Sequence, residues 1–299
     1  MRILLIAGGW STEREVSLHG AQGMQEALEE LGHTVTLFDL EHFDDLLDLA
    51  ATHDLAIINL HGDPGEDGLV QAILDQAGLP YQGTGAAGSL LALHKAATKQ
   101  IVQRAGLLTP KWEFIPRKPD FTWEPKLSYP IFAKSETGGS SIHLGKVHNR
   151  SELDSIMDEI FQAGAQVLLE EAISGHEVTC GILGDSPLPP VLIEPVAGTF
   201  FDYESKYAQD GAREICPAPL DAKIITKIQE DALEIHHLLG LEGVSRSDFI
   251  LDQDKLYFLE VNTLPGMTKT SLVPREAKVL GMDFPKLMAK FIELALNKK

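Results

Sequence analysis

The chain has 299 residues, of which 44% are hydrophobic and 23% charged, as expected for a globular protein of two or three domains. Its formal net charge of -19 argues against binding to duplex nucleic acid or to an anionic membrane surface, since both need clustered Lys and Arg. The two isolated cysteines exclude a disulfide framework, and because neither a signal peptide nor a run near the ~20 apolar residues of a membrane span is present, we expect a cytoplasmic protein without membrane contact.

The first 85 residues alternate between apolar strands and helical patterns. A fully apolar run over residues 3–7 ends at Gly8-Gly9, and further strands are predicted at 34–38 and 55–60. Helices are expected to begin within residues 11–15 and to cover 67–77. The order strand, helix, strand, helix is typical of an open parallel sheet in an α/β domain.

The remainder of the chain has the pattern of two α+β domains. In residues 86–175 we expect a long helix at 89–105, strands at 111–116, 130–134 and 167–171, and a helix at 151–163. In residues 176–299 we expect strands at 177–183 and 190–195, a polar loop at 198–213, a helix at 221–241, two alternating strands at 246–251 and 256–261, and a final helix at 284–296. The predicted domains are therefore 1–85, 86–175 and 176–299.

The two alternating strands near the C-terminus carry a candidate metal site. Side chains alternate faces along a strand, so Arg246 and Asp248 share one face, as do Glu260 and Asn262. With a turn at 253–255, Asp248 lies opposite Glu260. Carboxylate and amide oxygens are ligands that Mg²⁺ prefers, and a cation would relieve the repulsion between facing carboxylates. The alternative is that the carboxylates face water and stay apart.

Three loops are candidates for ligand contacts. Lys134 ends a strand and precedes a Gly/Ser loop at 135–141, which is either a phosphate cradle or a surface loop. The Pro-Gly loop at 263–268 either offers N–H groups to an oxyanion or is an ordinary turn. The G-x-G-x-x-G string at 83–88 is better explained as a domain hinge than as a dinucleotide site, because no acidic residue follows at the required distance.

Three polar side chains of the first domain stand where strands end. Glu13, His61 and Glu66 follow the predicted strands at 3–7 and 55–60. Ligands of open α/β sheets bind beyond the carboxyl ends of the strands, so these side chains are placed to meet one. A lone histidine is also often a structural residue.

Taken together, these strings resemble the D-alanine–D-alanine ligases of the ATP-grasp superfamily from the first strand to the last helix. The matching elements, in chain order, are Gly8-Gly9 with Glu13–Ser17, Leu60–Gly62 with Gly65–Gly68, Pro80-Tyr81 with Gly83 and Gly85, Lys95, Lys134 with Gly139–Ser141, Phe201–Glu204 with Lys206-Tyr207, Glu260–Thr263, Pro265–Thr268, and Ser271-Leu272.

The resemblance implies an ATP-grasp fold, with the first domain joined to two α+β domains that clamp ATP between their sheets. It implies that the carboxylate of one D-alanine takes the γ-phosphoryl group of ATP and that the amine of a second D-alanine then displaces phosphate, for peptidoglycan precursor synthesis. The implied cofactors are ATP and two Mg²⁺ ions, with Mn²⁺ as a possible substitute. The family's members are usually homodimers, so a homodimer is expected.

The resemblance also assigns roles to individual residues of this sequence. Lys95 and Lys134 would contact ATP phosphates under a loop with Ser140 and Ser141, Glu170 and Ile173 would hold adenine, and Glu177 would bind ribose. Asp248, Glu260 and Asn262 would hold the metal ions, while Arg246 and the amide of Gly266 would stabilise the oxyanion. Glu13 and His61 would bind the first D-alanine, Ser271 and Leu272 the second, and Lys206 and Tyr207 would lie on a loop that closes the site.

Specificity and departures from the family pattern leave alternatives open. The Lys206-Tyr207 pair favours the dipeptide, whereas relatives that make D-alanyl-D-lactate tend to lack it. Ser135, His143 and His94 stand where the family usually has Pro, Gly and Asp. A ligase with another second substrate, such as D-lactate or D-serine, is the main alternative. An ATP-binding regulatory module and a nicotinamide-dependent oxidoreductase are weaker ones.

Overall fold

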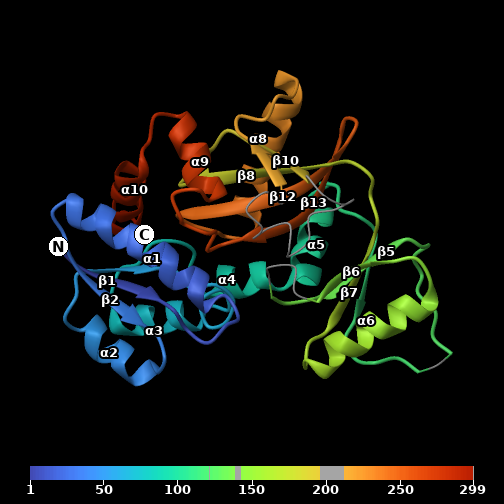
Figure 1. The fold of residues 1–299 in the computed structure, drawn as a ribbon, viewed down its shortest axis with the longest axis horizontal. Coiled ribbons are helices and arrows are strands. Elements are labelled where there is room, and N and C mark those ends of the chain that lie inside the picture. Colours follow the sequence, from blue (N-terminus) through green and yellow to red (C-terminus); the bar gives the residue numbers. More distant parts are fainter. Residues whose placement is uncertain (121, 139–142, 196–211, 299) are drawn as a thin grey trace.

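The computed structural model describes residues 1–120, 122–138, 143–195 and 212–298. Three β-sheets with flanking helices make up this part of the chain (Figure 1). None of the described helices is both long and apolar enough to cross a membrane.

The first sheet is parallel and buried on both faces. β1 (Arg2–Ala7) lies between β2 (Thr34–Asp39) and β3 (Leu55–Ile58). Alternate residues of β1 belong to two different hydrophobic cores, with Ile3 and Leu5 in one and Leu4 and Ile6 in the other. This two-sided burial explains the unbroken apolar run and confirms the predicted parallel sheet. The flanking helices are α1 (Arg14–Glu30), α2 (Phe43–Ala50) and α3 (Leu69–Ala77), of which α2 was not predicted.

The second sheet is antiparallel and carries one helix. Its strands follow the order β4 (Trp112–Ile115), β7 (Val167–Glu171), β5 (Ile131–Ser135) and β6 (Leu144–Val147). Helix α6 (Arg150–Gln162) packs on it and completes a separate core. Asn149 caps α6, since its side chain accepts a hydrogen bond from the N–H of Glu152.

The third sheet holds the predicted hairpin. Its strands follow the order β11 (Ala212–Ile215), β10 (Val191–Pro195), β8 (His176–Leu183), β12 (Val244–Asp252) and β13 (Lys255–Asn262), and β9 (Ser186–Pro187) pairs with β8. Helix α8 (Ala222–Leu238) packs against β8 and β12. The predicted pairing of Asp248 with Glu260 is confirmed. The predicted turn at 253–255 is wrong, because Asp252 pairs with Lys255, and a register shift between Asp248 and Phe249 brings Asp248 opposite Glu260. The expected end of the loop at residue 213 is wrong, since β11 begins at Ala212.

The helix expected at 89–105 is in fact two helices. α4 (Ala86–Leu93) and α5 (Lys95–Arg104) meet at His94, whose extended backbone (ψ 91°) interrupts the helical hydrogen bonding. Both helices contact β13, and their residues Ala92 and Val102 belong to the core of the third sheet. The break therefore places the first residue of α5, Lys95, at the boundary between the second and third sheets.

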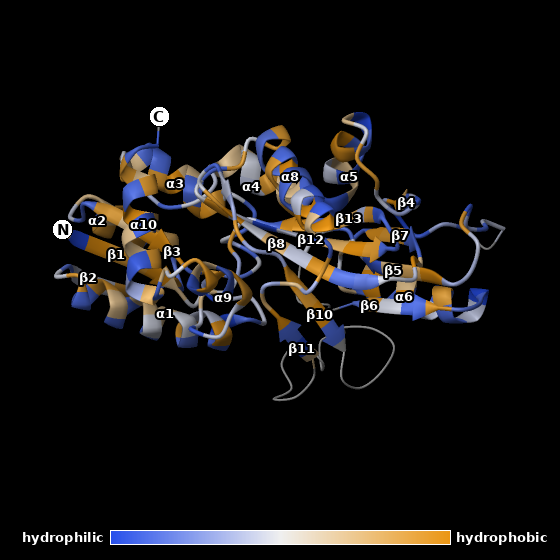
Figure 2. Cartoon of the chain, turned by 90° about the horizontal axis from the view of Figure 1, so that it is seen from above, coloured by the Kyte–Doolittle hydropathy of each residue, from blue (hydrophilic) through white to orange (hydrophobic). Residues whose placement is uncertain are grey.

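The last two helices return to the first sheet. α9 (Leu272–Val279), which was not predicted, contacts β8, and α10 (Phe284–Leu296) packs along α1. Seen from above, α10 lies beside α1 at one end of the molecule, and α6 lies at the other end (Figure 2). Val273, Phe291 and Ile3 share one core, so the N- and C-terminal segments are packed together. The domain boundaries at 85 and 175 stay a prediction.

Candidate active site

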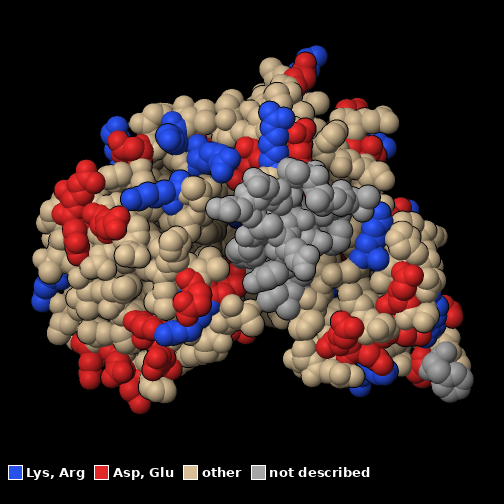
Figure 3. Space-filling model, in the orientation of Figure 1, with Lys and Arg blue, Asp and Glu red and all other residues tan. Residues whose placement is uncertain are grey.

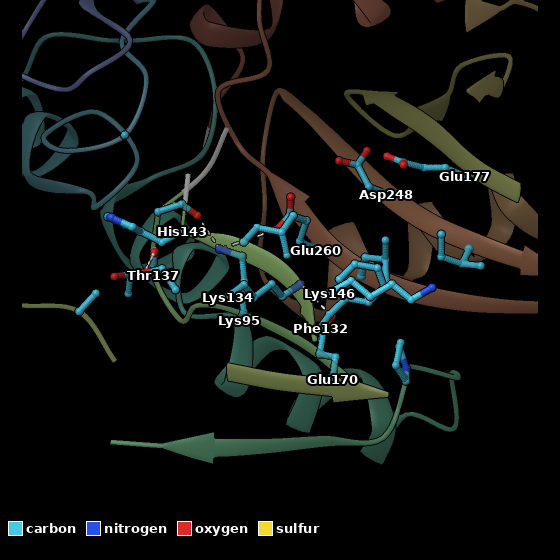
Figure 4. Close-up of a pocket in the computed structure, with 18 of the residues that line it drawn as sticks. Lys95, Phe132, Lys134, Thr137, His143, Lys146, Glu170, Glu177, Asp248 and Glu260 are labelled. Atoms are coloured by element: carbon cyan, nitrogen blue, oxygen red, sulfur yellow. Dashed lines mark hydrogen bonds and ion pairs between the residues drawn. The ribbon is translucent and has the colours of Figure 1, made fainter. Parts of the chain in front are cut away.

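A cavity of about 1240 Å³ lies between the second and third sheets (Figure 4). The start of α5 and the loop that follows β1 also reach it. The residues expected from the sequence that line it are Glu13, Lys95, Lys134, Glu170, Ile173, Glu177, Asp248 and Glu260. Segments that are far apart in sequence thus contribute side chains to one space.

The buried Lys95 and the largely buried Lys134 both face the third sheet. Lys134 lies on β5, and its Nζ is 2.9 Å from Glu170 Oε2. Lys95 begins α5, and its Nζ donates to the carbonyl of Gly138 at 2.5 Å and lies 3.7 Å from Glu260 Oε2. Burial lowers the pKa of Lys95, although Glu260 opposes the shift. Burial opposes the charge of Lys134 too, but Glu170 and Glu260 outweigh it and raise its pKa. Two cations held in this way can bind an anionic ligand.

Glu170 is the centre of a buried charge cluster. Its carboxylate contacts Lys134 on one side and Lys99 on the other, with Lys99 Nζ 2.7 Å from Oε1. Burial penalises the Glu170 charge, but the two lysines together lower its pKa. Burial lowers the pKa of Lys99 to about 8 against the pull of Glu170. The Glu170 side chain therefore organises the lysines, and Lys99 is a site residue to which the sequence assigned no role.

The hairpin places its polar side chains on one face, but they are not free of partners. Arg246 makes a bidentate contact with Asp248, with Nε to Oδ1 at 2.9 Å and a terminal nitrogen to Oδ2 at 2.8 Å. Thr179 also donates to Asp248 at 2.6 Å, and Asn262 Oδ1 accepts from the N–H of Leu264 at 2.9 Å. Burial opposes the charge of Arg246, but Asp248 outweighs it and raises its pKa. Within the described residues, no three His, Cys, Asp or Glu side chains are grouped closely enough to hold a metal ion by themselves.

The donor set nevertheless fits a hard divalent cation. Asp248 and Glu260 face each other across β12 and β13, and both line the cavity. Asn262 stands opposite Arg246 in the same pair of strands. An amide oxygen has two lone pairs, so its bond to Leu264 leaves one for a further partner. Two carboxylates and an amide oxygen suit Mg²⁺, which completes its coordination with water and substrate phosphates.

The loops of the first sheet supply acidic and imidazole groups. Glu13 immediately precedes α1 and lines the cavity. His61 is buried beside it, which lowers the pKa of His61 although Glu13 and a hydrogen bond with the Leu264 backbone oppose the shift. Burial, reinforced by Glu13, raises the pKa of Glu66 to about 7. The contact between His61 and Leu264 connects the first sheet to the loop that follows β13.

The loop after β13 is held by a hydroxyl cluster. Ser271 Oγ accepts from the N–H of Thr268 at 3.1 Å and lies 2.7 Å from Thr268 Oγ1. A Cβ at Gly266 would lie 3.3 Å from the same hydroxyl, so a side chain there would crowd the loop. Leu272 begins α9 directly after Ser271. In the described part of the chain, His61, Arg246, Asn262, Gly266, Ser271 and Leu272 do not line the cavity.

The remaining predictions concern four residues outside the described part of the chain and one residue with an unusual backbone conformation. Ser140, Ser141, Lys206 and Tyr207 lie outside the described residues. His143, which lines the cavity, adopts a left-handed backbone with φ 55°. That conformation favours glycine, the residue that the resemblance led us to expect at this position.

Two buried carboxyl groups near the site had no role in the sequence-based prediction. Glu136 lies just after β5 and contacts the start of α5. Glu276 lies on α9 and accepts from the N–H of Gly181 at 3.0 Å, and burial raises its pKa well above the ordinary value, with Arg246 opposing. Lys99 could have been found from its spacing, since it stands four residues after Lys95 on one helix. Glu136 and Glu276 offered no such signal, because their partners are distant in sequence.

Comparison with known proteins identifies the family. A family model described as the C-terminus of D-Ala D-Ala ligases matches residues 101–293. A D-alanine–D-alanine ligase of Desulfovibrio desulfuricans is 62% identical over 99% of this chain and 97% of its own length, and one of Lawsonia intracellularis is 57% identical over 99% of both.

Solved structures agree with the sequence relatives. The D-alanine–D-alanine ligase of Bacillus anthracis complexed with ATP superposes with a TM-score of 0.89 at 31% identity, covering 99% of this chain and 97% of that one. A D-Ala:D-Ser ligase of Enterococcus faecalis has a TM-score of 0.83 at 29% identity, covering 98% and 99%. These matches confirm the predicted ATP-grasp fold and the prediction of an ADP-forming ligase. The chain belongs to the D-alanine–D-alanine ligase family.

Proposed function

We propose that this chain joins two D-alanine molecules to D-alanyl-D-alanine with the conversion of ATP to ADP and phosphate, as a step in peptidoglycan precursor synthesis. The single observation that carries the proposal is the cavity that sets Lys95 and Lys134 opposite Asp248 and Glu260, with Glu13 at its edge. This reaction needs cations that bind phosphate, carboxylates that bind a metal ion and a carboxylate that binds the ammonium group of the substrate. As an ATP-consuming step on small metabolites, the reaction is expected in the cytoplasm.

The nucleotide would occupy the space between the second and third sheets. Lys95 and Lys134 would contact its phosphates, and Ile173 and the backbone beside Glu170 would hold adenine, with Glu177 near the ribose. Ser140, Ser141 and Lys206 are proposed to complete the phosphate contacts. The Glu170 carboxylate already binds Lys99 and Lys134, which supports a role in orienting the lysines besides any contact with adenine.

Asp248, Glu260 and Asn262 would hold two Mg²⁺ ions, for which Mn²⁺ can substitute. Bound Mg²⁺ neutralises charge on the β- and γ-phosphates. Asp248 is paired with Arg246 in this structure, so it would share its carboxylate between the guanidinium and a cation. A carboxylate has about four lone-pair sites, which is enough for both partners.

The chemistry then has two steps. A carboxylate oxygen of the first D-alanine, whose ammonium group would rest on Glu13 near His61, attacks the γ-phosphorus while the bond to the β-phosphate oxygen breaks and ADP leaves. The amine of the second D-alanine, held through its carboxylate by Ser271 and Leu272, loses a proton and attacks the acyl carbon, and phosphate leaves. Arg246, the Gly266 N–H and Tyr207 are proposed to stabilise or cover the charge that develops on the carbonyl oxygen.

The test is phosphate release with product identification. The chain is supplied with ATP, Mg²⁺ and D-alanine, and parallel reactions add D-lactate or D-serine or replace D-alanine by L-alanine. D-Alanyl-D-alanine formed in equal amount to phosphate supports the proposal. The likeness to a D-Ala:D-Ser ligase makes D-serine the main rival second substrate. Turnover only in that reaction, or only with D-lactate, would replace the dipeptide by a mixed product.

We also propose that the protein is a homodimer, as the resemblance implies. Sedimentation measured over a range of protein concentrations checks this directly. A mass of 32.7 kDa at every concentration would contradict it.

A further inference from the structure

The helix that begins with Lys95 does not cap its own N-terminus. His94 occupies the N-cap position of α5, and its side chain makes no capping hydrogen bond. The first N–H groups of a helix have no partner within the helix and need one elsewhere. At α5 the partner comes from a segment about forty residues further along the chain.

Glu136 supplies these missing contacts. Its Oε1 accepts from the N–H of Ala96 at 3.1 Å, its Oε2 accepts from Nδ1 of His94 at 2.9 Å, and its carbonyl accepts from the N–H of Lys95 at 3.3 Å. The side chain is 2% exposed, and its own N–H donates to the carbonyl of Gln166 at 2.9 Å. A carboxylate at this end of a helix is also favoured by the helix dipole.

The contacts tie together the two lysines that face the cavity. Glu136 follows Lys134 by two residues, and its carboxylate forms hydrogen bonds with His94 and Ala96, the residues on both sides of Lys95. Lys95 in turn donates to the carbonyl of Gly138, in the same segment that carries Glu136. The Glu136 carboxylate thus contributes to the position of α5 relative to β5, and with it to the separation of the two lysines.

We propose that Glu136 is a positioning residue for nucleotide binding, which caps α5 in place of the side chain at position 94 and so holds Lys95 beside the segment that follows Lys134. This role rests on the proposed function, because it takes Lys95 and Lys134 as contacts of ATP phosphates. A role in stability alone would lower the melting temperature and leave nucleotide affinity unchanged.

The first measurement is the affinity of Glu136→Ala for ADP in the presence of Mg²⁺, by calorimetry, together with KM for ATP and for D-alanine. We expect the Kd for ADP and the KM for ATP to rise about tenfold, which corresponds to ~1.4 kcal/mol, while the KM for D-alanine changes less than twofold. Unchanged nucleotide affinity in a less stable variant would overturn the proposal. If Glu136→Ala does not fold, Glu136→Gln can be used, since it keeps the side-chain volume and one acceptor. The Kd for ADP and the KM for ATP should then rise by a smaller factor, again with little change in the KM for D-alanine.

A double-mutant cycle tests the capping explanation. Aspartate is a strong N-cap, so His94→Asp in the Glu136→Ala background is expected to restore most of the ADP affinity. In the wild-type background the same His94→Asp change sets a second carboxylate beside Glu136 and is expected to weaken ADP binding. If His94→Asp changed the ADP affinity in the same direction in both backgrounds, the proposal would be overturned. Asp283, whose carboxylate caps α10 away from the cavity, provides the matched control, since Asp283→Ala should lower stability without changing ADP affinity.

The ADP measurement separates this inference from the proposed function. A wild-type protein that binds ADP and makes no D-alanyl-D-alanine would contradict the proposed reaction, whereas the ADP affinities of the variants would still decide the role of Glu136.

Discussion

Glu66 is a carboxyl group whose pKa the fold raises into the physiological range. Burial first, and then the charge of Glu13, raise its pKa from 4.5 to about 7. A group whose folded pKa lies above its unfolded pKa stabilises the fold fully below the unfolded value and loses that contribution as pH rises through the folded value. The window in which stability falls therefore extends from about pH 4.5 to just above pH 7.

We expect Glu66→Gln to remove this part of the pH dependence, because glutamine is neutral throughout. The variant should be more stable than the wild type at pH 8, by up to about 3 kcal/mol. Denaturant unfolding at pH 5, 6, 7 and 8 measures the difference. The exposed residue Glu159 gives the control, and Glu159→Gln should follow the wild-type curve. Parallel curves for Glu66→Gln and the wild type would show that Glu66 titrates alike in both states.

Glu260 is the residue on which the metal proposal can be tested most directly. It lines the cavity opposite Asp248, and its Oε2 is 3.7 Å from Lys95 Nζ. We expect Glu260→Gln to abolish D-alanine-dependent phosphate release, since the amide is a weaker ligand for Mg²⁺. Asp254→Asn, in the exposed turn of the same hairpin, is the control and should keep wild-type turnover. Near-normal turnover of Glu260→Gln across a Mg²⁺ titration would remove it from the metal ligands.

At the scale of elements, the hairpin of β12 and β13 could be predicted and the start of α5 could not. Alternation in 246–251 and 256–261 predicts which side chains share a face, and it indicated that Asp248 and Glu260 meet. The turn is one residue shorter than expected, and a register shift between Asp248 and Phe249, which the sequence pattern does not reveal, restores this pair. The break at His94 depends on hydrogen bonds to Glu136, which is distant in sequence. Local helix propensity continues through position 94, and only the tertiary contact ends α4 there.

The segment between β5 and β6 contains a backbone position that its residue tolerates poorly. His143 has φ 55°, and its carbonyl accepts from the N–H of Ser135 at 3.2 Å, so this left-handed residue is held against the end of β5. A residue with a Cβ costs roughly 1–2 kcal/mol of stability when it adopts a left-handed backbone. Glycine removes this cost, but its greater backbone freedom in the unfolded chain costs about 0.5–1 kcal/mol in return.

We therefore expect His143→Gly to raise the free energy of unfolding by roughly 0.5–1 kcal/mol. Thermal unfolding without nucleotide measures the effect. His143→Ala keeps the Cβ while removing the imidazole, so it serves as the control and should not be stabilising. A gain in both variants would assign the effect to the imidazole and not to the backbone.

At the scale of the whole molecule, the chain packs its segments together in ways that sequence patterns do not reveal. The helices α9 and α10 share a core with β1 and α1, and α4 and α5 share one with the third sheet. Periodicity identifies the apolar face of α10 without naming the element that covers it. On the face drawn in Figure 3, a notch at the lower edge separates the lobe that carries β5 and α6 from the lobe that carries α2 and α3. The candidate site belongs to these long-range contacts, so its residue types were predictable and most of its hydrogen bonds were not.

Lys99 is the residue that joins the second and third sheets through buried charge. Its Nζ lies 2.7 Å from Glu170 on β7 and donates to the carbonyl of Phe258 on β13 at 3.2 Å, and the side chain is 0% exposed. Removing one partner of a buried ion pair leaves the other charge uncompensated, which is strongly destabilising. Here Lys134 still contacts Glu170, so part of the compensation remains.

We expect Lys99→Met to lower the free energy of unfolding by about 3 kcal/mol. The matched control is the neighbouring pair Lys111 and Glu171, which joins the same region at 3.6 Å but with a Lys111 side chain that is 78% exposed. Exposed pairs contribute little, so Lys111→Met should change stability by less than about 1 kcal/mol. Urea unfolding of both variants measures the contrast. If Lys99→Met were as stable as Lys111→Met, the Lys99–Glu170 pair would contribute little to joining the two sheets, and the cavity between them would not depend on that pair for its shape.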